Sequence, residues 1–418
     1  MFIVYDLIFL VITFIFLPVY LFRRKFHSGL LRRLGILPRD LGLASPIWIH
    51  AVSVGEVMAV KKLLEGLRQL YPDKRLVIST VTPTGNKVAK GLLKDGDFLT
   101  YLPLDFSFTV NRVINKIKPS LFIIAETEIW PNLIRGLYKK NIPVAIVNGR
   151  ISDASFKGYS AIKFLLKPIL RKVSLFCMQA ESDAERLMHL GAAKEKIKIA
   201  GNMKFDAAPN LFSHTAVKLG IRPDEELIVA GSTHPGEEEV ILEAYKDLLP
   251  EFPGLRLLIA PRHPERASDI EKLVEKNGFK PLLISKLLST IDYRLSTIFI
   301  LDTIGELLDY YAICDIVFVG GSLVKKGGHN ILEPAALSKP IIFGPHTFNF
   351  RDIAQLYLKE QAAILAHNQQ ELKEGIKYLL ANPNKKEELG RKAKDLILAN
   401  QGATKRNLEY LGRVVNAK

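Results

Sequence analysis

The chain has 418 residues, of which 48% are hydrophobic, which is enough for two or three domains with large cores. Its net charge is +15, and the basic residues are spread along the chain. The sequence has no Arg-rich tail, zinc-finger spacing or aromatic RNA-binding motif. An anionic membrane surface or a phosphorylated substrate therefore explains the charge as well as nucleic acid does. The two cysteines, Cys177 and Cys314, lie in apolar stretches, which argues against a disulfide scaffold and fits a reducing compartment.

The N-terminal segment predicts a membrane anchor. Residues 7–22 are uncharged and apolar, and with residues 2–5 the run reaches about twenty residues, enough for one membrane span. Basic residues follow the run and only Asp6 interrupts it near its start, so the positive-inside rule predicts that the rest of the chain lies in the cytoplasm. A cleaved signal peptide fits less well, because its charges would precede the apolar run. Pro18 leaves open a monotopic anchor that does not cross the membrane.

After the anchor, short strands rich in Val and Ile alternate with amphipathic helices, which is typical of parallel sheets covered on both faces. In the first half, strands are predicted at 47–52, 75–80, 98–102, 121–125, 144–147, 174–179 and 197–200, and helices at 56–71, 84–93, 108–117 and 130–140. After a polar stretch at 206–224, strands are predicted at 227–230, 256–260, 298–301, 316–319 and 340–343, with helices at 237–249, 265–276, 306–312 and 330–337. Polar helices at 370–380, 385–400 and 404–415 are predicted to pack on the outside.

This order predicts an α/β fold with two Rossmann-like domains facing a cleft, and ligands at the carboxyl ends of the strands. The predicted parts are a membrane anchor (2–22), an N-terminal domain (35–206), a linker (207–222), a C-terminal domain (223–400) and a C-terminal helix (401–418).

The stretch GGSLVKKGGHNILEPAALSKPIIFGPHTFNFRD (320–352) predicts a nucleotide-sugar site. Its glycines follow a strand and precede a helix, so backbone N–H groups and the helix N-terminus would approach a phosphate. Glu333 would accept hydrogen bonds from sugar hydroxyls. An ordinary strand-to-helix turn is the alternative. No strand is followed by GxGxxG and no GxxxxGK[ST] occurs, so neither an NAD site nor a P-loop is predicted.

Three loops of the first half carry candidate chemistry. In HAVSVGE (50–56), Glu56 opens a helix, where it is either a general base or only a favourable partner of the helix dipole. In ETEIWPN (126–132), Glu126 follows an apolar strand and is either a structural carboxylate or a site carboxylate paired with a cation. In GNMKFD (201–206), Lys204 is a candidate ligand for a carboxylate or phosphate.

Three loops of the second half are expected at the same rim as the glycine-rich stretch: GSTHPGEE (231–238), PRHPER (261–266) and TIGEL (303–307). Arg262 would reach a phosphate, whereas His263 and Arg266 order the loop or contribute to the site. No CxxC or HExxH spacing occurs, so no metal site is predicted, and GxSxG is also absent.

Together with TVTPTG (80–85) and GPHTFNFRD (344–352), these segments resemble the 3-deoxy-D-manno-octulosonic acid (Kdo) transferases, which add Kdo to the lipid A precursor. The resemblance runs in order over nearly the whole chain. It implies a GT-B glycosyltransferase fold, with the acceptor, the phosphorylated glycolipid lipid IVA, in the first half and the donor CMP-Kdo in the second. It also implies an anchor in the cell inner membrane with catalytic domains on the cytoplasmic face, no nucleic-acid partner and no metal cofactor.

The resemblance assigns roles to single residues. Glu56 matches the proton acceptor, and Glu126 and Lys204 match positions that stabilise the transition state. Lys204 would face the Kdo carboxylate, and we expect Glu126 to hold it there. The positions that match CMP-binding residues are Pro261, Arg262, Ile304, Gly305, Glu306, Asn330, Ile331, Leu332 and Glu333. The alternatives are another GT-B transferase or epimerase that uses a UDP-sugar, and a non-catalytic membrane-anchored protein that binds sugar nucleotides.

Overall fold

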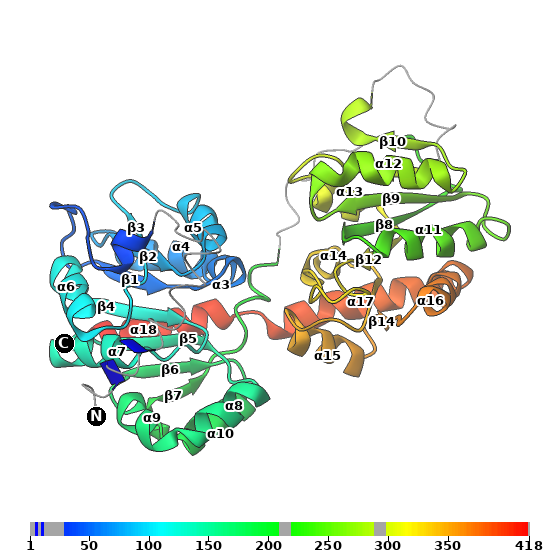
Figure 1. Ribbon diagram of the computed structural model, residues 1–418. Helices are drawn as coiled ribbons and strands as arrows, with labels where there is room; N and C mark the ends of the chain where they lie inside the picture. The colour runs from blue at the N-terminus through cyan, green and yellow to red at the C-terminus, as the bar shows by residue number, and fades with distance from the viewer. Residues whose placement is uncertain (1–4, 7–9, 12–28, 209–218, 288–297, 417–418) are drawn as a thin grey trace. The chain divides into compact units, whose positions relative to one another are not determined.

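The computed structural model of the protein describes residues 5–6, 10–11, 29–208, 219–287 and 298–416. The chain forms two compact units (Figure 1): unit 1 contains Met1–Ala207 and Asn400–Lys418, and unit 2 contains Ala208–Ala399. The predicted anchor (2–22) and the predicted linker (207–222) lie mostly outside the described residues. Within the described ranges, no helix is long and apolar enough to cross a membrane.

Unit 1 is built on a parallel sheet with the strand order β3-β2-β1-β4-β5-β6-β7. Its strands are β1 (Ile47–His50), β2 (Leu76–Thr80), β3 (Phe98–Tyr101), β4 (Leu121–Ala125), β5 (Val144–Gly149), β6 (Leu175–Met178) and β7 (Ile197–Ile199). Its helices include α2 (Leu30–Arg33), α3 (Val54–Ala59), α4 (Lys61–Leu70), α5 (Pro83–Lys90), α6 (Ser107–Ile117) and α7 (Pro131–Lys139). The strand order reverses between β1 and β4, which is where parallel sheets of this kind bind ligands.

The sheet of unit 1 is apolar on both faces, because helices cover each face. Along β1, Trp48 packs into one core, whereas Ile47 and Ile49 pack into the other, and all three are fully buried. Because alternate residues of β1 enter the two cores, both sides of the strand are apolar until His50.

The structure confirms the predicted strands to within a few residues and adds elements that the pattern did not predict. The predicted helix 56–71 is two helices, α3 and α4, which meet at Val60. The helices α8 (Asp153–Ala161), α9 (Lys163–Leu170) and α10 (Glu181–Leu190) were not predicted, nor were β10 (Pro281–Leu283), β14 (Ile364–Leu365) and α15 (Arg351–Lys359). In α8 and α9, exposed apolar residues such as Phe164 blur the helical pattern.

The C-terminal helix α18 (Ala403–Asn416) belongs to unit 1, where sequence analysis expected a separate external element. Its Ala403 and Leu411 are fully buried in a core of unit 1. The side chain of Asp206 accepts hydrogen bonds from the backbone N–H groups of Gly402 and Thr404 and so caps the start of the helix. The chain therefore leaves unit 1 just after Asp206 and returns beside it.

Unit 2 is a second parallel sheet, with the order β10-β11-β9-β8-β12-β13-β14. Its remaining strands are β8 (Glu226–Thr233), β9 (Leu255–Pro261), β11 (Ile298–Ile300), β12 (Ile316–Val319) and β13 (Ile341–Phe343). Its remaining helices are α11 (Glu237–Leu248), α12 (Ala267–Lys276), α13 (Leu307–Ile313), α14 (Leu332–Ala336), α16 (Gln369–Ala381) and α17 (Pro383–Asn400). The strand order reverses between β8 and β12.

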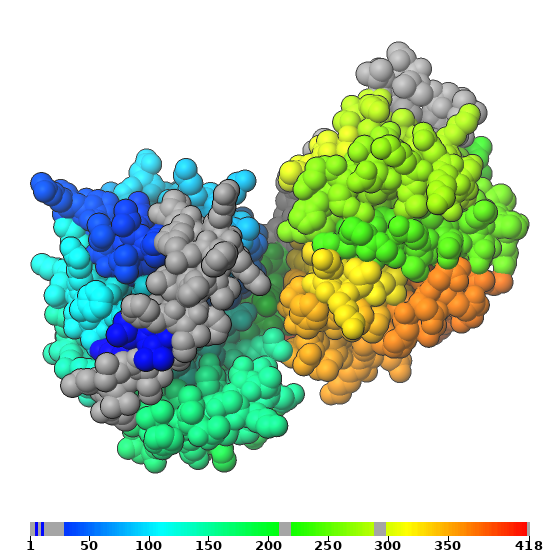
Figure 2. Space-filling model, viewed as in Figure 1, coloured from blue at the N-terminus to red at the C-terminus, as the bar shows by residue number. Residues whose placement is uncertain are grey.

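The polar helix α16 packs beside α11 on the outside of unit 2 (Figure 2). Lys373 pairs with Asp247 at 3.3 Å, and Lys377 pairs with Glu251 at 2.6 Å. These exposed pairs explain why the helix carries so much charge, but pairs of this kind each contribute little to stability.

Candidate functional site

Three loops at the carboxyl ends of β1, β4 and β7 bring the predicted catalytic residues of unit 1 together. The Nζ atom of Lys204 lies 3.4 Å from Oε1 of Glu126, so the expected contact between these two side chains is present. The charges of Glu126 and Glu128 both raise the pKa of Glu56, which places the three carboxylates within electrostatic reach of one another. A cluster of acids beside one lysine has the composition expected of a site that moves a proton.

Glu56 lies in the first turn of α3 and folds back onto the loop before it. The backbone N–H of Val52 donates to Oε2 at 2.7 Å, and the hydroxyl of Ser53 donates to Oε1 at 3.1 Å. Burial raises the pKa of Glu56 to about 7, against the opposing effect of the bond from Val52. Glu56 therefore holds the loop before its helix and also has the pKa of a general base near neutral pH.

Glu126 has a strained backbone. Its φ of +58° is left-handed, a conformation that non-glycine residues rarely adopt and that concentrates at functional sites. It directly follows β4, and its own N–H donates to the carbonyl of Val147 at 2.9 Å. The backbone bond holds the residue in this costly conformation beside Lys204.

Asn148 positions the loop that carries Lys204, a role that sequence analysis missed. It also has a left-handed backbone, with φ at +53°. Its side-chain oxygen accepts the N–H of Met203 at 2.9 Å, which ties the loop to the end of β5. The signal was present in VAIVNG, because a polar residue there continues a buried strand without a break.

His50 and Glu128 form a second polar contact beside this site. His50 is fully buried, and its Nδ1 donates to the carbonyl of Ser79 at 3.0 Å. Its Nε2 lies 3.6 Å from Oε2 of Glu128, which also accepts a hydrogen bond from Nε1 of Trp130 at 3.0 Å. The hydrogen bond from Trp130 holds Glu128, and the ring of His50 lies beside it beyond hydrogen-bond distance.

In unit 2, the loops after β9 and β12 bring Arg262 to Asn330 and Glu333. Nδ2 of Asn330 donates to Oε1 of Glu333 at 3.0 Å. Burial raises the pKa of Glu333, while Asn330 and the charge of Arg262 act in the opposite direction. Pro261, Ile331 and Leu332 are buried.

The third predicted donor segment, Ile304 to Glu306, lies at the start of α13, which packs against α14. Oε2 of Glu306 accepts the hydroxyl of Thr303 at 2.8 Å. The side chain of Ile304 is 86% exposed, and Gly305 has a φ of +99° with open space around it. The segment presents an apolar side chain and a glycine backbone to solvent, and both suit contact with a flat base or sugar.

Three glycines of 320–328 bind groups of the protein with their backbone N–H groups. The N–H of Gly320 donates to the carbonyl of Gly231 at 2.8 Å, and that of Gly328 donates to the carbonyl of Gly321 at 2.7 Å. The N–H of Gly321 donates to Glu237 at 2.7 Å. The predicted helix 330–337 is shorter in the structure, where it is α14. The side-chain oxygen of Asn330 accepts a hydrogen bond from the backbone N–H of Leu332. These N–H groups are bound within the protein, so they are not offered to a phosphate.

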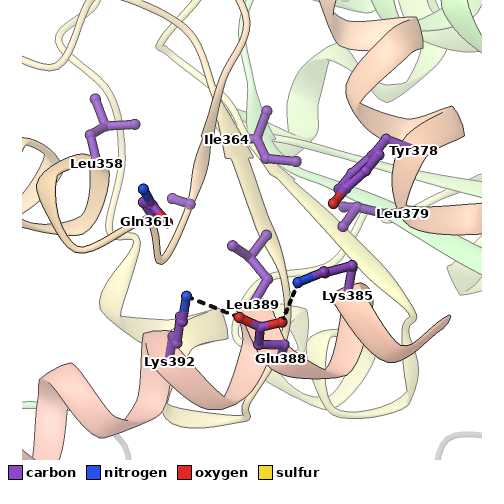
Figure 3. A pocket seen from close by; sticks show the side chains of 10 residues that line it. Leu358, Gln361, Ile364, Tyr378, Leu379, Lys385, Glu388, Leu389 and Lys392 are labelled. Atoms are coloured by element: carbon purple, nitrogen blue, oxygen red, sulfur yellow. Dashed lines mark hydrogen bonds and ion pairs between the residues drawn. The ribbon is translucent and has the colours of Figure 1, made fainter. Parts of the chain in front are cut away.

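A pocket of about 280 Å³ lies between α15, β14, α16 and α17 (Figure 3). Its lining residues include none of the predicted site residues. At the edge of the pocket, Glu388 forms ion pairs with Lys385 at 2.8 Å and with Lys392 at 3.0 Å. The charged side chains that line this edge are therefore paired with one another. Within the described parts of both units, no group of three His, Cys, Asp or Glu residues is arranged to hold a metal ion.

Comparisons with known proteins point to one family. The family model described as 3-deoxy-D-manno-octulosonic-acid transferase (kdotransferase) matches residues 28–207, and the model described as glycosyl transferases group 1 matches residues 238–396. A 3-deoxy-D-manno-octulosonic acid transferase of Haemophilus influenzae is 39% identical over 87% of this chain and 86% of its own length. One of Chlamydophila psittaci is 33% identical over 85% of this chain and 83% of its own length.

The solved structure of UDP-GlcNAc 2-epimerase from Neisseria meningitidis has a TM-score of 0.57 to this chain. The match covers 88% of this chain and 100% of the epimerase chain, at 13% identity. At this identity the likeness shows the fold alone: two Rossmann-like domains in a GT-B-like chain.

Proposed function

Because this chain belongs to the 3-deoxy-D-manno-octulosonic acid transferase family and is a glycosyltransferase that transfers Kdo in lipopolysaccharide biosynthesis, we propose that its donor is CMP-Kdo and its acceptor is lipid IVA. Unit 2 binds the donor and unit 1 the acceptor. The observation that carries the proposal is the position of Glu56, a carboxyl group with a pKa of about 7, beside Glu126 and Lys204 at the switch point of unit 1.

Glu56 is the general base in this proposal. Its carboxylate takes the proton of the acceptor hydroxyl as the hydroxyl oxygen attacks the anomeric carbon of Kdo. The bond from that carbon to the phosphate oxygen breaks, CMP leaves with the electron pair, and the configuration inverts. A base with a pKa near the working pH combines a large ionised fraction with enough basicity to accept the proton.

Lys204 and Glu126 act on the charge that develops during transfer. The ammonium group of Lys204 faces the carboxylate of Kdo, and Glu126 holds Lys204 in place through the contact at 3.4 Å. A fixed cation in a partly buried site stabilises developing charge more strongly than a mobile one in water, because it needs no reorganisation.

The donor is held by Pro261, Arg262, Ile304, Gly305, Glu306, Asn330, Ile331, Leu332 and Glu333. Glu333 and Glu306 accept hydrogen bonds from hydroxyl groups, and Arg262 balances the phosphate that leaves. A nucleoside monophosphate has no diphosphate to neutralise, so we propose that no metal ion takes part.

Residues 2–22 anchor the enzyme to the inner membrane, with both units on the cytoplasmic face. The described residues at the start of this segment contact unit 1. The hydroxyl of Tyr5 donates to Asp105 at 3.0 Å, and Asp6 accepts from Nδ2 of Asn132 at 2.6 Å. These contacts tie the beginning of the apolar run, Tyr5 and Asp6, to unit 1. Deleting residues 2–22 is expected to release the enzyme from the membrane fraction.

The test is incubation of the protein with CMP-Kdo and lipid IVA, followed by the mass of the product, which also counts the Kdo units added. The Glu56→Ala variant is expected to lose transfer and keep CMP binding. UDP is expected to compete poorly with the donor. Strong competition by UDP, or normal turnover by Glu56→Ala, contradicts the proposal.

A further inference from the structure

A buried carboxylate joins the two central loops of unit 2. Glu237, the first residue of α11, has no exposed surface. Four backbone N–H groups donate to it. Gly321 and His234 bind Oε2 at 2.7 and 3.0 Å, and Ser322 and Leu323 both bind Oε1 at 2.9 Å. A row of N–H groups that converges on one anion is the geometry with which proteins bind phosphates, but here the anion is a side chain of the same chain.

These bonds lie where the strand order of unit 2 reverses. His234 follows β8, and Gly321 to Leu323 follow β12, so Glu237 fastens together the loops of two neighbouring strands. In parallel sheets, the crevice between the loops at such a reversal is where ligands bind. A residue that fixes both loops therefore fixes the shape of that crevice.

The connection continues from Glu237 to the predicted donor residues. Nε2 of His234 lies 2.9 Å from Nε2 of His329, and the two rings stack with centroids 5.2 Å apart. The carbonyl of Gly321 accepts the N–H of Gly328 at 2.7 Å. Both contacts hold the segment directly before Asn330, whose side chain binds Glu333.

We propose that Glu237 is a positioning residue for donor binding: its carboxylate, held by four N–H groups, sets the loop 320–330 and thereby the placement of Asn330 and Glu333. The inference rests on the proposed function, in which these two residues bind CMP-Kdo. Glu237 itself does not touch the donor.

Glu237→Gln tests the proposal, because glutamine keeps the shape but turns an NH₂ group toward two of the four N–H donors. Clashing donors in a buried site are costly, so CMP binding measured by calorimetry is expected to weaken by roughly tenfold or more. In kinetics, the KM for CMP-Kdo is expected to rise while the KM for the acceptor stays unchanged. Glu239→Gln is the matched control, since Glu239 is an exposed acid in the same helical turn. It is expected to bind CMP as the wild type does.

The outcomes are distinguishable. If the wild type does not bind CMP, the proposed function fails and this inference fails with it. If Glu237→Gln folds and binds CMP like the wild type, only the inference about Glu237 is overturned. The same holds if its kcat falls while its KM for CMP-Kdo is unchanged, because a smaller folded fraction has that effect. Weakened binding by Glu239→Gln also overturns it, because loss of any nearby charge would then suffice.

If Glu237→Gln does not fold, Gly321→Ala tests the same loop without changing a charge. Gly321 has a φ of +69°, and a Cβ there would meet the ring of His329 at 2.9 Å. This variant is also expected to weaken CMP binding, and unchanged binding overturns the inference.

Discussion

The raised pKa of Glu56 predicts that transfer slows as the pH falls through neutrality. Burial is the largest cause of the shift to about 7, and the neighbouring charges of Glu126 and Glu128 add to it. Only the ionised carboxylate accepts a proton. Its ionised fraction falls from roughly nine-tenths at pH 8 to roughly one-tenth at pH 6, so kcat/KM is expected to fall about tenfold. A glutamate with its ordinary pKa near ~4.3 would stay ionised throughout this range, and the rate would not change.

The assay is CMP release at saturating lipid IVA, with kcat/KM for CMP-Kdo measured from pH 6 to pH 8. The phosphates of the acceptor also titrate near pH ~6, so a control must separate the two titrations. Glu128→Gln provides it. Removing a charge that raises the pKa of Glu56 shifts the acid limb of the profile to lower pH, whereas titration of the acceptor does not respond to a change in the protein. A flat profile from pH 6 to pH 8, or the same limb in both enzymes, would refute the assignment of Glu56.

Four further outcomes are expected. Because folding raises the pKa of Glu56 to about 7, its ionisation costs stability that grows from the ordinary pKa near ~4.3 up to about pH 7 and is constant above it. In urea unfolding, the gain in stability of Glu56→Gln over the wild type should therefore be larger at pH 8 than at pH 5, by about 2–3 kcal/mol. Lys204→Met is expected to lower kcat by roughly a hundredfold in the CMP-release assay, with the folded fraction unchanged by circular dichroism. Asn330→Ala should weaken CMP binding in calorimetry by roughly fivefold to tenfold, since it removes the partner of Glu333, and equal affinity would contradict the donor site. Asp206→Ala should cost about 1–2 kcal/mol in urea unfolding, because it removes the cap of α18; Asp224→Ala, at an exposed position, serves as the control.

Local patterns were enough to predict most of the strands, the two Rossmann-like halves and most of the residues in the candidate site. Runs such as LFIIA and VAIV predict buried parallel strands, because a strand covered on both faces has no polar side. Since the carboxyl ends of parallel strands meet at one edge of a sheet, the residues that follow them, Glu126 and Lys204 among them, are expected to come together without knowledge of the full fold.

Other features depended on which distant segments meet, and only the tertiary structure decided them. The polar sequence of α18 does not show that its buried side belongs to unit 1, where Asp206 caps it. Nor does the glycine-rich stretch show that Glu237, 84 residues earlier in the chain, fills the N–H cradle that the pattern assigned to a phosphate. The physical reason is the same in both cases. Hydrophobic periodicity reports which side of an element is buried, whereas the partner that satisfies a buried donor or carboxylate is chosen by contacts between elements far apart in sequence.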